Sequence, residues 1–99
     1  MPSNQGSQPS IDPGLTGMVK QAVADLATRL DVVQGAISVI SAELVTWPDS
    51  NYGCPQKGRV YLPVVADGSR IVLAHGNTRF EYHTGGSTIA PFLCTTPTR

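Results

Sequence analysis

The chain has 99 residues, with seven Lys and Arg balanced by seven Asp and Glu, so its formal net charge is zero. This length provides one small domain with a single modest core, and the balanced charge excludes the basic surface typical of proteins that bind nucleic acid or anionic membranes. Charged residues make up only 14% of the sequence, below the usual share, so uncharged polar side chains must solvate most of the surface, which favours an extracellular domain.

A disordered tether is predicted at the N-terminus, over residues 1–11. Its first nine residues, MPSNQGSQP, carry no charged side chain and cannot bury enough apolar surface to become ordered. Such a segment is typical of the stretch that follows a processed signal peptide or a lipidated cysteine, and a leader added for expression explains it equally well. No apolar run in the sequence is long enough to be a transmembrane helix.

An amphipathic helix is predicted from Asp12 to about residue 30. Asp12 is a good N-cap and Pro13 suits the first helical position, while Thr16 is a second candidate cap. The apolar residues then recur at helical spacing on one narrow, Ala-rich face that suits close packing on a sheet. They are Val19, Ala22, Val23, Leu26, Ala27 and Leu30.

Four or five antiparallel strands are predicted to follow the helix. They are residues 37–47, 60–65, 70–74, 78–84 and a short 92–94. The imperfect alternation of the first strand indicates a β-bulge near Ser41. Asp67-Gly68 and Gly76-Asn77 each predict a hairpin turn between neighbouring strands. Together these elements predict an α+β fold, with one N-terminal helix packed on a curved sheet of four or five antiparallel strands. The single domain spans residues 12–95, and residues 96–99 are expected to be loose.

The central stretch, WPDSNYGCPQKGRVY (residues 47–61), combines the only Trp, one of two cysteines and many turn-forming residues. A disulfide between Cys54 and Cys94 would close about forty residues of chain and stabilise the fold by roughly 4 kcal/mol. Small secreted domains use cysteines in this way. The competing interpretations are two reduced thiols, or a zinc site completed by His75 and His83. The sequence lacks the closely spaced Cys or His pairs from which compact zinc sites are built.

The histidines give no clear catalytic pattern. His75 lies beside a predicted turn, where it is expected to be solvated. His83 is predicted to share a strand face with Glu81 and Arg79, which favours an ion-pair ladder. Because neither a nucleophile motif nor a carboxylate pair accompanies them, the sequence predicts no enzyme, no metal and no cofactor.

The central stretch can also be interpreted as a binding loop. In a structural role, Trp47 and Tyr52 would cap the edge of the core. In a functional role, residues 49–59 would bind a protein of unknown identity, because a loop held by a disulfide is preorganised. The predicted binding residues are Tyr52, Gln56, Lys57 and Arg59. The alternative is a serine-protease inhibitor that presents Lys57 or Arg59.

Six short motifs occur in order along the chain. They are Val45-Thr46-Trp47-Pro48-Asp49, Gly53-Cys54-Pro55, Tyr61, Arg70-Ile71-Val72-Leu73, Phe80-Glu81-Tyr82-His83-Thr84 and Cys94. Together they resemble the pattern of a widespread group of small bacterial exported or lipoprotein-type domains. The resemblance covers the chain from about Val19 to Cys94. It implies export and a bond between Cys54 and Cys94, and it implies no particular activity.

One position departs from that pattern. The group usually has Leu before Gly53, whereas this chain has Tyr52, a larger amphipathic residue that indicates a surface facing a protein. The layout also resembles cystatin-type folds, in which an antiparallel sheet wraps a helix. The cystatin loop motif Q-x-V-x-G is absent, and Trp47-Pro48 reverses the cystatin order, so inhibition of cysteine proteases is not carried over. We therefore expect a secreted or surface-tethered bacterial domain that binds a protein, with no nucleic-acid partner.

Overall fold

The computed structural model describes residues 10–86 and 89–95, and it confirms the predicted α+β fold. A 3-10 turn (Pro13–Leu15) leads into helix α1 (Thr16–Leu30), and a second 3-10 turn follows at Gln34–Ala36. The five strands are β1 (Ser10–Ile11), β2 (Ser38–Trp47), β3 (Ala66–His75), β4 (Thr78–Gly85) and β5 (Ile89–Cys94). They form one sheet in the order β1-β2-β3-β4-β5, antiparallel except for the β1–β2 pair.

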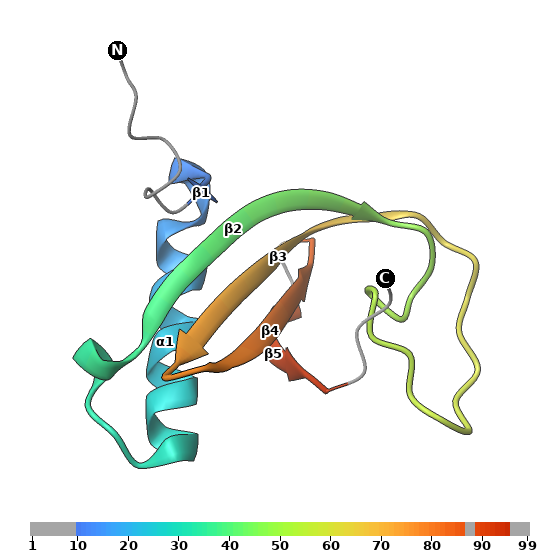
Figure 1. Ribbon diagram of the computed structural model, residues 1–99. Coiled ribbons are helices and arrows are strands. Elements are labelled where there is room, and N and C mark those ends of the chain that lie inside the picture. The colour runs from blue at the N-terminus through green and yellow to red at the C-terminus, as the bar shows by residue number, and fades with distance from the viewer. Residues whose placement is uncertain (1–9, 87–88, 96–99) are drawn as a thin grey trace.

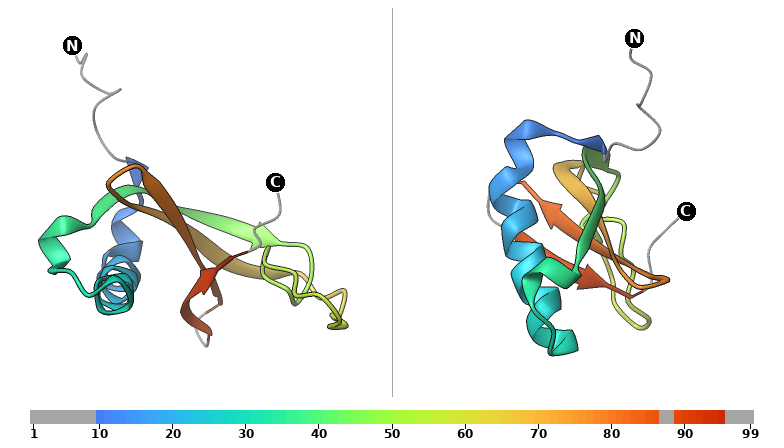
Figure 2. Two further views of the ribbon diagram at one scale, coloured as in Figure 1. Left: turned by 60° about the horizontal axis from the view of Figure 1, so that its bottom comes forward. Right: turned by 60° about the vertical axis from the view of Figure 1, so that its left-hand side comes forward.

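Helix α1 covers one face of the curved sheet (Figures 1 and 2). The predicted cap at Asp12 is present, since its carboxylate accepts a hydrogen bond of 2.8 Å from the Gly14 amide and caps the 3-10 turn. The α-helix itself begins three residues later than Pro13, at Thr16, and has no side-chain cap of its own. Four of the six predicted core residues of the helix are buried, and the other two are half-buried. They pack against Ile71 and Leu73 of β3 and Tyr82 of β4, each of which has no exposed surface. The Tyr82 hydroxyl donates a 2.6 Å hydrogen bond to Asp25 of the helix, so a hydrogen bond also joins β4 to α1.

Strand β2 contains the predicted bulge. Its pairing with β3 shifts between Val39 and Ser41, so Ile40 is the extra residue. The shift lets Val39 and the buried Ala42 both pack on the helix side despite their odd spacing. Strands β2 and β3 bow past the end of the helix and carry the loop between them away from the core (Figure 1).

The predicted hairpin at Asp67-Gly68 is wrong. Both residues lie inside β3, paired with Thr46 and Val45 of β2, and residues 60–65 form no strand. Glycine is required at position 68 for close packing rather than for a turn, since a Cβ there would lie 2.1 Å from the Thr84 carbonyl oxygen. Pro63 was the available signal against a strand over residues 60–65, because proline cannot donate to a ladder.

The remaining strands agree with the sequence more closely. The Gly76-Asn77 turn joins β3 to β4 as predicted, and β5 is three residues longer than expected.

Ser10 and Ile11, which composition assigned to the N-terminal tether, pair with β2 as β1. The other tether residues, 1–9, and the predicted loose C-terminus, 96–99, lie outside the described residues. No helix in the described part of the chain is long and apolar enough to cross a bilayer.

Candidate functional site

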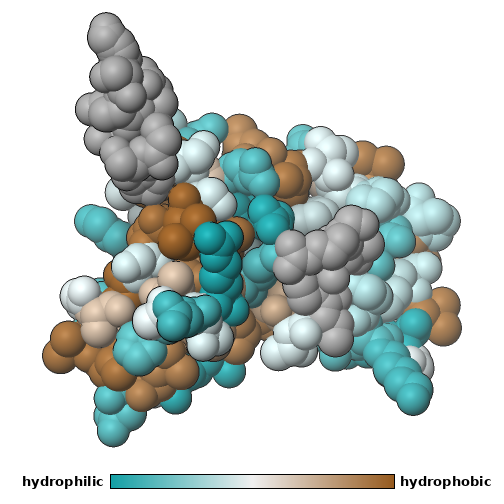
Figure 3. Space-filling model, viewed as in Figure 1, coloured by the Kyte–Doolittle hydropathy of each residue, from teal (hydrophilic) through white to brown (hydrophobic). Residues whose placement is uncertain are grey.

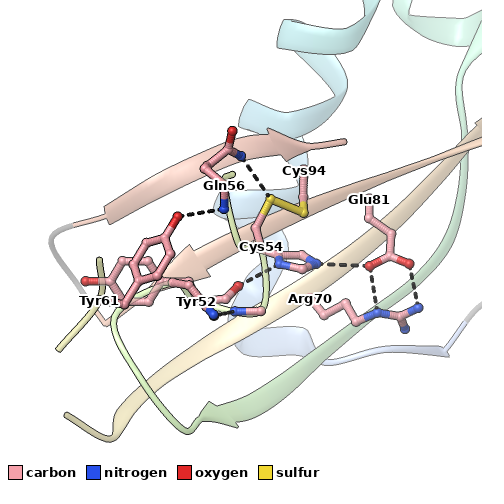
Figure 4. The surroundings of a disulfide bond; sticks show 10 residues. Tyr52, Cys54, Gln56, Tyr61, Arg70, Glu81 and Cys94 are labelled. Atoms are coloured by element: carbon pink, nitrogen blue, oxygen red, sulfur yellow. Dashed lines mark hydrogen bonds and ion pairs between the residues drawn. A yellow bond between two sulfur atoms is a disulfide. The ribbon is translucent and has the colours of Figure 1, made fainter. Parts of the chain in front are cut away.

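The candidate site is the loop of residues 48–65, which joins β2 to β3. A disulfide between Cys54 and Cys94 fastens it to the end of β5, with the two Cα atoms 5.7 Å apart (Figure 4). The predicted bond is confirmed, and both sulfurs are therefore engaged with each other. This overturns the alternatives of reduced thiols and of a zinc site built on Cys54, His75, His83 and Cys94.

The first part of the loop folds tightly onto the sheet. The Asp49 carboxylate accepts from the Asn51 amide at 2.9 Å, and the Asn51 side-chain oxygen accepts from the Gly53 amide at 2.7 Å. Tyr52 and Gly53 both have left-handed backbones, with φ of 51° and 71°. Gly53 is required here because a Cβ at this position would lie 2.3 Å from the Trp47 ring.

The predicted exposure of Tyr52 at the crest of the loop is wrong. Its side chain is half-buried and lies directly over Gly85, where a Cβ would come within 2.5 Å of the ring. Its carbonyl oxygen accepts a 2.7 Å hydrogen bond from Nδ1 of His83 (Figure 4). Tyr52 therefore packs on β4 and helps to anchor the loop.

A buried polar network lies beneath this anchor, on the sheet face opposite α1. Nε2 of His83 lies 3.0 Å from Glu81, and Arg70 donates two hydrogen bonds to the Glu81 carboxylate at 3.0 and 2.9 Å. A further bond of 3.3 Å joins Arg70 to the exposed Glu43. The predicted ladder of His83 and Glu81 is thus present, but its cation is Arg70 of the neighbouring strand and not Arg79.

Burial disfavours the ionised form of Glu81, but the hydrogen bonds from Arg70 and His83 outweigh that cost and lower the pKa of its carboxyl. The same carboxylate raises the pKa of Arg70 through its hydrogen bonds, against the opposing effect of burial. We conclude that Glu81 and Arg70 form a stable ion pair over the ordinary pH range.

The His83 ring packs against two other aromatic rings. It stacks on Trp47 with ring centroids 4.7 Å apart and meets Phe92 edge-on at 6.2 Å. Trp47 in turn donates a 2.8 Å hydrogen bond to the Thr84 carbonyl. Because both nitrogens of His83 have partners and the residue is only 1% exposed, its geometry is that of a structural residue that positions the loop.

The second part of the loop projects into solvent but is braced. The Ser50 amide donates to the Leu62 carbonyl at 3.0 Å, and the Leu62 amide donates to the Ser50 hydroxyl at 2.8 Å. The Tyr61 hydroxyl accepts a 2.7 Å hydrogen bond from the Gln56 amide. A turn closed by the Arg59 amide and the Gln56 carbonyl at 3.2 Å forms the tip.

Three of the four predicted binding residues, Gln56, Lys57 and Arg59, are exposed on this second part. Beside them lies a run of exposed aliphatic residues for which the sequence predicted a strand. Its members are Val60, Leu62, Val64 and Val65, with exposed fractions of 96%, 65%, 55% and 68%. We call these seven residues the loop surface. Figure 3 shows hydrophobic patches at the right-hand end of the molecule, where the loop lies in Figure 1.

The chain was compared with known proteins. The family model described as "Domain of unknown function (DUF8738)" matches residues 19–94, which include α1, strands β2 to β5 and the whole loop. No curated protein and no solved structure matches the chain.

Proposed function

The chain belongs to the family described as a domain of unknown function (DUF8738), and on that premise we propose that it is a non-enzymatic binding domain whose loop surface recognises a protein outside the cytoplasm. The observation that carries the proposal is the loop surface itself, which is a run of exposed aliphatic side chains beside two cations on a loop held by a disulfide.

Exposed aliphatic residues scattered singly need no explanation, but a contiguous group commonly marks an interaction site. Here four of them fall within six consecutive positions on a loop that makes no core contact through them. Burying them against a partner would recover the free energy that their exposure to water costs in the isolated domain.

The bracing of the loop supports binding for a second reason. The disulfide, the Ser50–Leu62 hydrogen bonds and the Tyr61–Gln56 bond already restrict its conformation. A partner therefore has less conformational entropy to remove on binding, which is the usual advantage of a preorganised loop.

The charges of the loop define the chemistry of the partner. The loop of residues 48–65 contains two cations, Lys57 and Arg59, and one acidic residue, Asp49, whose carboxylate accepts a hydrogen bond from the Asn51 amide. The complementary surface is an apolar patch flanked by carboxylates, because opposite charges at the rim speed encounter and exclude wrong partners.

The disulfide supports the proposed location. It indicates an oxidising environment, which agrees with a secreted or surface-tethered bacterial protein.

The test compares two triple variants. In the first, Val60, Leu62 and Val64 are each replaced by Ser, and in the matched control the exposed aliphatic residues Ile11, Val33 and Leu44 are replaced in the same way. Each protein is immobilised and incubated with an extract of the cell envelope of the source bacterium. Proteins that are retained are identified, purified and tested again for binding. We expect one acidic partner to bind the wild type and the control and to be lost with the loop variant. Equal retention by all three proteins would contradict the proposal.

The serine-protease inhibitor is the alternative function, favoured by the exposure of Lys57 and Arg59 at the braced tip. Titration of trypsin-like proteases with micromolar protein distinguishes the two. Inhibition that disappears in Lys57→Ala or Arg59→Ala would establish the inhibitor function and contradict the proposed binding function.

A further inference from the structure

A hollow of about 520 Å³ lies on the sheet, and its volume is in the range of small-molecule sites. Strand pairing places Ser41, Val72, Glu81 and Cys94 in one row across its floor. None of the residues that line it belongs to the loop of residues 48–65, so the hollow and the loop surface are separate features.

Two charged residues in the hollow, Glu81 and Arg79, differ in the partners that they have. Both oxygens of Glu81 accept hydrogen bonds from Arg70, and one also faces His83, so this carboxylate is satisfied. Arg79 also lines the hollow. It lies two residues before Glu81 on β4, so the two residues are on the same face of the strand. Within the described residues the Arg79 guanidinium makes no hydrogen bond or ion pair. Among the residues that the structure describes, the hollow therefore presents the Arg79 cation without a partner, next to the Arg70–Glu81 ion pair.

The rest of the lining is largely apolar. Ile40, at the bulge of β2, lies on one side, and Val72 forms part of the floor. Phe80 and Leu93 also border the hollow, but their side chains pack against the core on the helix side of the sheet. A guanidinium beside apolar walls favours a ligand with one carboxylate and a hydrocarbon portion, because a planar carboxylate matches the two parallel N–H donors of arginine. A polyphosphate would need several unpaired cations and would leave the apolar walls uncovered.

We propose that this hollow is a binding site for a small amphiphilic monocarboxylate, of the size and kind of a medium-chain fatty acid. The Arg79 guanidinium binds the carboxylate, and the hydrocarbon chain lies over Val72 and Ile40. The bulge at Ile40 contributes directly, since it turns an extra side chain of β2 toward the hollow.

The test uses octanoate as the probe, with octanamide as an uncharged ligand of the same length. Binding is followed by NMR shifts of the Val72 and Ile40 methyl groups. We expect octanoate to shift both methyl groups and octanamide to bind much more weakly. In Arg79→Gln the octanoate affinity should fall roughly ten- to hundredfold, the usual effect of one charge-assisted hydrogen bond. The matched control Lys20→Gln removes an exposed cation of α1 and should bind as the wild type does.

Three outcomes would overturn the site: equal affinity for octanoate and octanamide, no effect of Arg79→Gln, or no methyl shift with millimolar octanoate. A fourth arm uses an apolar tetrapeptide with a free C-terminus. If the peptide binds and octanoate does not, the carboxylate belongs to a protein terminus and the fatty-acid site is wrong. Circular dichroism of Arg79→Gln verifies its folding, and Arg79→Lys, which keeps the charge but loses the paired donors, should fall between the two.

Discussion

Replacing Cys54 and Cys94 together by Ala removes the only covalent link between the loop and β5. Alanine is preferred to serine because both cysteines are buried, and a buried hydroxyl without a partner would add a cost of its own. The bond joins residues separated by 40 positions. In the chain-entropy treatment, a closed loop of that length stabilises the folded state by roughly 4 kcal/mol. Because small domains have a free energy of unfolding of about 5–15 kcal/mol, the variant should lose a large share of its stability.

Urea unfolding followed by Trp47 fluorescence measures this loss, since the indole is buried beneath the loop. We expect the free energy of unfolding to fall by about 4 kcal/mol and the urea dependence to steepen, because the unfolded chain without the bond is more expanded. Wild-type protein treated with a reductant is the matched control and should show the same loss. A loss below about 1 kcal/mol in both samples would refute the argument, because the bond would then not limit the unfolded chain.

Three further changes test other parts of the structure by the same unfolding measurement. Gly53→Ala should cost at least about 2 kcal/mol, because its Cβ would overlap the indole ring at a positive φ. Gly58→Ala, at a φ of 82° but in open space, should cost only about 1 kcal/mol, and an equal loss would contradict the steric argument. Tyr82→Phe removes the hydrogen bond to the helix and should cost roughly 1–2 kcal/mol, and a neutral result would show that the bond contributes nothing net. Glu81→Gln should cost about 2 kcal/mol at neutral pH, whereas the exposed Glu43→Gln should cost less than about 1 kcal/mol.

The pH dependence of stability gives Glu81→Gln a second readout. The folded-state pKa of Glu81 is lowered, since its hydrogen bonds outweigh the effect of burial. Its contribution to stability is therefore fully present above the unfolded value of about 4.3 and is lost as the pH falls through the lower folded value. Wild-type stability should fall more steeply than that of the variant below this pH. Parallel pH profiles would contradict the assignment.

His83 and Tyr52 position the loop on the sheet. His83, which the sequence predicts as part of an ion-pair ladder with Glu81, has partners for both ring nitrogens, and Trp47 and Phe92 pack against its ring. Tyr52, which stands out by its place in the loop, packs on Gly85. The exposed aliphatic residues that follow Arg59 are less conspicuous in the sequence.

The sequence by itself determined the features that depend on short-range chemistry. The Asp12 cap, the apolar face of α1, the bulge near Ser41 and the Gly76-Asn77 turn follow from periodicity and local hydrogen bonding. The Cys54–Cys94 pairing was also accessible, because a chain with two cysteines allows one intramolecular bond.

Only the tertiary structure decided which side chains meet across strands and what covers them. Asp67-Gly68 has the chemistry of a hairpin turn, but position 68 is occupied by glycine because the Thr84 backbone and the Trp47 ring lie against it. Arg70 rather than Arg79 became the partner of Glu81 because the pairing of β2, β3 and β4 sets which cation lies beside the carboxylate. Such contacts join residues far apart in the chain, so no local pattern specifies them.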